Sequence, residues 1–135
     1  MIFMAKKVDI EELKSKLRYG VKIWLEFQGE EKNENILGSG WARLLDIISK
    51  TDHCSLTYAA QECKYSYKYA WNILKRIEER TGLSPVITSK GGKGGGGSIK
   101  LSEWGLHLLN TYNKISAKLE NTKKELHTFS ILNDK

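Results

Sequence analysis

The sequence has few cysteines and no long apolar run, and each shortage excludes a class of protein. Its two cysteines, Cys54 and Cys63, are too few for a disulfide framework and suggest a reducing, cytoplasmic environment. No apolar run approaches the roughly 18 residues of a membrane-spanning helix, and the segment 1–4 is too short for a signal peptide. We therefore expect a cytoplasmic chain with no membrane association.

Residue sets typical of catalysis and metal binding are also missing. No Ser/His/Asp set, paired carboxylates or Cys/His pair stands out, so we predict no catalytic residue and a protein that is not an enzyme. His53, Cys54 and Cys63 could form a redox or metal sensor, but their spacing matches no common zinc pattern. Buried structural cysteines are the favoured interpretation. We predict no metal, cofactor or small-molecule effector.

The composition that remains is that of one globular domain with an uneven charge. The chain has 135 residues, of which 40% are hydrophobic and 28% charged, enough for a single core with at most one appendage. Residues 64–100 carry eight of the 22 Lys and Arg but only two of the 16 Asp and Glu, which accounts for the whole net charge of +6. This concentration indicates a polyanionic partner, although a solvated lysine-rich face is the simpler alternative.

Hydrophobic periodicity predicts a mainly α-helical fold with a small β component. The predicted N-terminal helix carries Val8, Leu13 and Leu17 on one side. The first predicted elements are a helix capped by Asp9 that runs to Gly20, strands at 21–27 and 35–38, and a helix capped by Ser39. A short helix begins at Ser55, and a longer helix runs from Ser66 to about Thr81, where Gly82 ends it. Two β-prone segments follow at 85–89 and 98–101, and a final helix begins at Ser102.

Two short helices with a tight turn, followed by a glycine-tipped hairpin, predict a winged helix–turn–helix. The second helix, residues 66–81, would have one face toward the core and one toward the major groove of double-stranded DNA. Spacing assigns Tyr67, Ala70, Trp71, Leu74 and Ile77 to the core face. The DNA face combines cations, an amide and aromatic hydroxyls without a carboxylate, and the candidate contacts are Tyr65, Ser66, Lys68, Tyr69, Asn72, Lys75 and Arg76.

The hairpin tip, residues 90–100, is the second candidate DNA contact. Lys90, Lys93 and Lys100 lie around a glycine run that lets the backbone approach a phosphate strand closely. A surface loop without function is the alternative. A nucleotide-binding P-loop is excluded, because no Lys-Ser or Lys-Thr pair follows the glycines.

Segments across residues 21–112 carry a resemblance to a known family. They are Ile36-Leu-Gly-Ser-Gly40, Arg43-Leu-Leu, Ser55-Leu-Thr-Tyr-Ala-Ala60, Ser66-Tyr-Lys-Tyr-Ala-Trp71, Gly91-Gly-Lys-Gly-Gly-Gly-Gly97 and Leu101-Ser-Glu-Trp-Gly105. Together they resemble the N-terminal DNA-binding domain of the ModE family of molybdate-responsive transcriptional regulators. The resemblance implies a dimeric winged helix whose dimer contacts come largely from terminal helices. It also places Lys64 at a turn position often held by glycine, where left-handed geometry is costly.

The resemblance does not extend to a sensor. Family members continue into molybdate-binding domains, and no segment of that size follows here, so we expect no molybdate sensing from this chain. The predicted organisation is an N-terminal helix at 1–20 with a possible dimer contact, a DNA-binding domain at 21–101, and a dimerisation helix and tail at 102–135.

The final helix carries a heptad-like apolar seam, which we predict to pair with a second copy. Folding back on its own subunit is the alternative. The predicted function is a dimeric, nucleoid-associated transcriptional regulator. An architectural DNA-binding protein without sequence preference and a protein-interaction adaptor that works through the last helix are the other hypotheses. The predicted dimer residues are Leu108, Tyr112, Ile115, Leu119 and Leu126.

Overall fold

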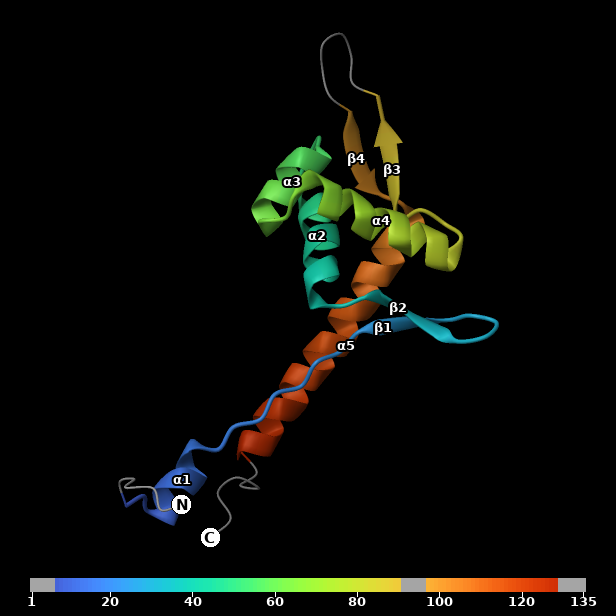
Figure 1. The fold of residues 1–135 in the computed structure, drawn as a ribbon. Helices are drawn as coiled ribbons and strands as arrows, with labels where there is room; N and C mark the ends of the chain where they lie inside the picture. The colour runs from blue at the N-terminus through green and yellow to red at the C-terminus, as the bar shows by residue number, and fades with distance from the viewer. Residues whose placement is uncertain (1–6, 91–96, 129–135) are drawn as a thin grey trace, which may run out of the picture. The chain divides into compact units, whose positions relative to one another are not determined.

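The protein is described by a computed structural model that covers residues 7–90 and 97–128. The mainly helical fold with a small β component is confirmed (Figure 1). Each of the two antiparallel sheets in the described residues has two strands. The elements are α1 (Ile10–Lys16), β1 (Leu25–Gln28), β2 (Asn33–Leu37), α2 (Ser39–Lys50), α3 (Leu56–Cys63), α4 (Tyr67–Thr81), β3 (Val86–Ser89), β4 (Ser98–Leu101) and α5 (Glu103–Thr128).

The chain divides into two compact units, and α5 contributes residues to both. The larger unit is Ile23–Ile115, and the smaller one combines Met1–Lys22 with Ser116–Lys135. The larger unit contains the hydrophobic core, to which α2, α3, α4 and the first half of α5 contribute. Its fully buried side chains are spaced three and four residues apart on these helices, as amphipathic helices require.

The first hairpin is shorter on one side than the sequence predicts. A strand was expected over 21–27, but β1 begins at Leu25, which is paired with Leu37, the last residue of β2. The next residue, Gly38, already caps α2. Residues 21–24 therefore have no strand opposite them, although their alternating pattern is that of a strand.

Side-chain caps fix most helix starts where the sequence predicts them. The hydroxyl of Ser55 accepts a hydrogen bond from the Tyr58 backbone N–H, and that of Ser66 accepts one from Tyr69. Asp9 caps α1 in the same way. The prediction for α2 was one residue off: Gly38 is the cap and makes no side-chain bond, while Ser39 lies inside the helix.

The turn between α3 and α4 is left-handed at a residue that is not glycine. Lys64 ends α3 with φ 61° and ψ 36°, and its backbone N–H donates to the Gln61 carbonyl at 3.0 Å. His53, with φ 50°, is the other non-glycine residue with a positive φ in the described segments. A side chain with a Cβ is disfavoured in this region of backbone space.

We expect Lys64→Gly to raise the free energy of unfolding by about 1 kcal/mol, because glycine removes the steric cost of the left-handed turn. Denaturant unfolding monitored by circular dichroism measures the change. Lys64→Ala is the matched control, since it removes the same charge but keeps the Cβ, and it should give no such gain. An equal gain in both variants would assign the effect to charge instead of backbone strain.

In the smaller unit, α1 has no buried side chain. This helix has seven residues and ends at Lys16, earlier than the predicted Gly20. The Tyr19 hydroxyl donates to the Lys123 backbone carbonyl at 2.6 Å. The apolar side chains of Val8, Leu13 and Leu17 are each more than half exposed.

Candidate nucleic-acid interface

α4 presents one side to the core, and an arginine near its end fastens it to the first hairpin. Ala70, Ile73, Leu74 and Ile77 are buried in the hydrophobic core, and α4 packs against α3 and β2. Arg80 forms an ion pair with Glu34 at 3.3 Å and donates to the Asn35 carbonyl of β2. Arg80 is thus a positioning residue, a role that the sequence analysis did not assign. The side of α4 opposite its buried residues faces solvent.

The solvent side of α4 carries three unneutralised cations. Lys68, Lys75 and Arg76 are exposed, and none of them forms an ion pair within the described part of the chain. Asn72 lies between them on the helix and is partly buried. The prediction that this face lacks carboxylates is wrong at its C-terminal end, where Glu79 is exposed on the same side.

Two aromatic residues assigned to the core are on the surface instead. Tyr67 and Trp71 are 54% and 46% exposed, and Ile73 occupies the core in their place. The core contacts α4 from the side centred on Ala70 and Ile77, about 100° away from Trp71 around the helix. The ammonium of Lys75 lies 5.5 Å from the centre of the Trp71 ring, a cation–π contact at the surface.

Three other predicted contact residues have partners within the protein. The Tyr65 hydroxyl donates to the Gly40 carbonyl at 3.1 Å, and the ring packs against the core. Burial raises the pKa of this phenol, so it stays protonated and able to donate at neutral pH. Ser66 is the cap of α4, while the exposed Tyr69 accepts from the Trp41 indole and meets the Tyr65 ring edge to face. Tyr65 therefore supports the turn and does not belong to the exposed face.

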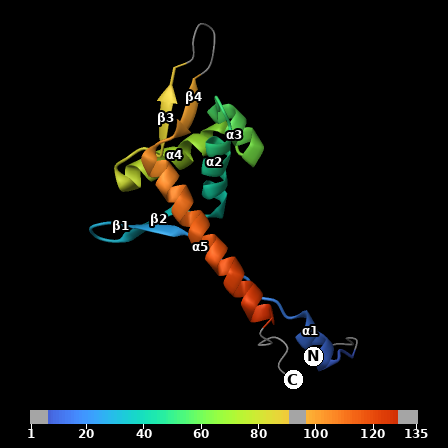
Figure 2. The same ribbon diagram turned by 180° about the vertical axis from the view of Figure 1, so that it is seen from behind.

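The β3–β4 hairpin projects beyond α2, α3 and α4 in both views (Figures 1 and 2). Its strands are in register from Val86↔Leu101 to Ser89↔Ser98. The Ile99 backbone N–H donates to the Cys54 carbonyl at 2.8 Å, which fixes β4 to the segment just before α3. This bond holds the hairpin base in place relative to the helices that precede α4.

The hairpin lysines are exposed where the structure describes them. Lys90 directly follows β3, and Lys100 lies in β4 opposite Ile87. Lys93 lies outside the described residues. The hairpin therefore supplies two further cations to the larger unit, and no ion pair in the described segments neutralises either of them.

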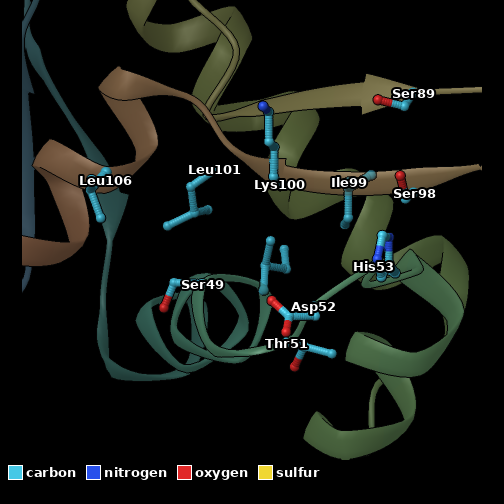
Figure 3. A pocket seen from close by; sticks show the side chains of 11 residues that line it. Ser49, Thr51, Asp52, His53, Ser89, Ser98, Ile99, Lys100, Leu101 and Leu106 are labelled. Carbon is cyan, nitrogen blue, oxygen red and sulfur yellow. The ribbon is translucent and has the colours of Figure 1, made fainter.

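A pocket of about 420 Å³ lies along β4, between this strand and the end of α2 (Figure 3). Figure 3 shows Ile99 pointing toward His53 and Asp52, while Lys100 extends from the other side of the strand. This is the alternation expected of a β-strand. It leaves the Lys100 ammonium in solvent, although the residue also borders the pocket.

Both cysteines are buried in the core, as the favoured interpretation predicts. Cys54 and Cys63 are 1% and 4% exposed and form no disulfide. Burial raises the pKa of both thiols, and at Cys63 the nearby Arg43 only partly opposes this effect. The described residues contain no cluster of three His, Cys, Asp or Glu that could hold a metal ion.

We expect both thiols of the folded chain to react with a disulfide reagent on the order of 100-fold more slowly than those of the denatured chain at pH 7.5, because they are protonated and inaccessible. The absorbance of the released thiol gives both rates. Fast reaction of either cysteine in the folded chain would contradict this interpretation and support a redox sensor.

The predicted seam on α5 divides into a buried part and a more exposed part. Leu108 and Tyr112 are 3% and 8% exposed and belong to the hydrophobic core of the chain itself, so they offer no surface to a second copy. This corrects their assignment to a dimer interface. Ile115 is 42% exposed, and Leu119 and Leu126 are half-buried.

No protein-family model and no curated protein matches the chain. None of the described helices has the length and apolar character needed to cross a membrane. The resemblance to the ModE family thus stays a prediction from the sequence.

Proposed function

We propose that the chain is a winged helix–turn–helix transcriptional regulator that binds double-stranded DNA as a dimer, similar to the DNA-binding domain of the ModE family. In this proposal α3 and α4 form the helix–turn–helix, α4 enters the major groove, and the β3–β4 hairpin is the wing. The observation that carries it is the exposed side of α4, where Lys68, Lys75 and Arg76 have no ion-pair partner within the described segments.

Charge and geometry together favour DNA over another anionic partner. An α-helix fits the major groove, and cations along it can contact phosphates on both sides or the edges of guanine. Among the ion pairs of the described residues, Arg80–Glu34 alone involves α4, and it lies one turn beyond Arg76 and joins α4 to β2. Lys90 and Lys100 extend the positive surface to the hairpin.

Selection of bound duplexes from a random pool, followed by a salt titration of the best binder, tests the proposal. A regulator should enrich one sequence and bind it about 1,000-fold or more tightly than random duplex. A steep salt dependence without enrichment would favour an architectural protein instead. Absence of duplex binding at low salt would overturn the proposal and leave the adaptor hypothesis.

The dimer part of the proposal is supported by the exposed apolar side chains of the smaller unit. Isolated helices of fewer than about 12 residues are marginal in water, yet α1 has only seven residues and buries none of them. Ile10, Leu13 and Leu17 recur at helical spacing, and all are more than half exposed. A second copy of the chain would cover this stripe.

We expect Leu13→Glu to convert the dimer into a monomer, because it places a carboxylate in the middle of the apolar stripe. Light scattering coupled to size-exclusion chromatography gives the mass. Ser15→Glu is the matched control, since it adds the same charge to the other side of α1 and should leave the mass unchanged. A monomeric unmodified chain at micromolar concentration would refute the dimer.

A further inference from the structure

We infer that Trp71, held in place by Lys75, reads the C5-methyl group of a pyrimidine in the DNA major groove and so contributes sequence specificity. This inference rests on the proposed DNA-binding function and assigns a specific role to a residue that the sequence pattern places in the core. A methyl group at C5 is present on thymine and on 5-methylcytosine, and it is the one apolar group that base edges display in this groove.

The position of Trp71 is the first support. Its indole is 46% exposed on α4, one turn from Lys68 and one turn from Lys75. In the proposed complex, a duplex that these two cations contact would also approach the Trp71 ring. The two carboxylates of the helix, Glu78 and Glu79, lie about two turns from Trp71 toward its C-terminus.

The contact with Lys75 is the second support. The ammonium lies 5.5 Å from the centre of the Trp71 ring, a cation–π contact that favours one orientation of the ring before any ligand binds. An aromatic ring held in one orientation loses little conformational entropy when it is buried against a base. In the proposed complex, Lys75 would bond to the O6 and N7 of guanine, and the Trp71 ring beside it would contact the neighbouring base pair.

The positively charged residues beside the Trp71 ring favour a role in DNA binding over one in protein binding. A large exposed aromatic residue is also typical of protein interfaces, but interface centres are poor in lysine. Trp71 lies beside Lys68 and Lys75, two cations without ion-pair partners in the described residues. A ligand that combines negative charge with a small apolar group is complementary to these side chains. DNA with methylated bases combines both, because its phosphates are anionic and its C5-methyl groups are apolar.

Removal of single methyl groups tests the inference on the duplex that selection yields. Each thymine is replaced in turn by deoxyuridine, which pairs in the same way but lacks the methyl, and affinities are measured by fluorescence anisotropy. Burial of one methyl corresponds to about a fourfold change in affinity. The unmodified chain should lose this factor at one or two positions per half-site, and Trp71→Ala should bind thymine and deoxyuridine duplexes equally there. Trp71→Phe should retain part of the difference.

Trp24→Ala is the matched control, because Trp24 is 51% exposed and lies outside α4. It should keep the full sensitivity to methyl removal.

A second comparison replaces the same positions by cytosine or by 5-methylcytosine. If the methyl group raises the affinity in a Trp71-dependent way on both thymine and 5-methylcytosine, the methyl alone is read. If it raises the affinity on thymine only, the O4 of thymine is needed as well. DNA binding without methyl sensitivity, or sensitivity that survives in Trp71→Ala, would overturn this inference alone. Failure to bind or select any duplex would overturn the regulator proposal together with it.

Discussion

Charge reversal at both Lys68 and Arg76 should lower the affinity for the selected duplex by on the order of 100-fold or more at about 0.1 M salt. Both side chains are exposed on α4 and have no ion-pair partner in the described part of the chain. Glutamate at these positions removes two cationic contacts and adds repulsion from the phosphates. Anisotropy titrations at several salt concentrations should also show a salt slope smaller by about two for each bound copy.

The control for this prediction is the pair Lys32→Glu and Lys114→Glu. These two lysines are exposed as well, but they lie in the loop between β1 and β2 and on α5. The change in net charge is the same, so any general effect of charge appears equally in both double variants. Equal losses of affinity would show that α4 makes no specific contribution, and circular dichroism should show unchanged helix content in both variants.

Gly105→Ala should lower the free energy of unfolding by about 2 kcal/mol, although alanine is the better helix former. Gly105 is buried at the start of α5, and a Cβ there would collide with the backbone carbonyl of Pro85, just before β3. The Ser102 N–H donates to that same carbonyl at 2.9 Å, so neither segment can move without breaking this bond. Chemical denaturation gives the change in stability.

Gly20→Ala is the matched control, because a Cβ at Gly20 meets nothing within 4 Å. It should change stability by no more than about 0.5 kcal/mol. If Gly105→Ala were instead stabilising, by up to the roughly 1 kcal/mol that helix propensity predicts, α5 and Pro85 would not be in close contact. The comparison thus measures how tightly the base of the hairpin is joined to α5.

Local signals predicted the elements well, because the energies that set them act over a few residues. Ser55 and Ser66 cap α3 and α4, and Gly82 ends α4 with φ 88°, as their types and spacing indicate. The left-handed conformation of Lys64 was anticipated only as a cost implied by the resemblance, since lysine itself carries no signal for it. Where a local pattern lacked a partner, as at residues 21–24, the prediction of a strand was wrong.

Burial was predicted less well, because helical spacing gives the relative angles of side chains but not the direction of the core. Tyr67 and Trp71 share a flank with Leu74, yet the core lies on the other side of Leu74 and leaves both aromatic rings exposed. The seam of α5 shows the same effect. Its spacing is regular, but Leu108 and Tyr112 fall where the core is and Ile115 beyond it.

The amino-acid sequence alone specifies the order and type of the elements, the segment that carries the net positive charge and the small number of cysteines. Each of these depends on composition or on interactions between near neighbours. The tertiary structure decides which side chains face solvent. It assigns Tyr65 and Arg80 to internal contacts and leaves Lys68, Lys75, Arg76 and Trp71 as the outer surface of α4, because contacts between distant segments set the direction of the core.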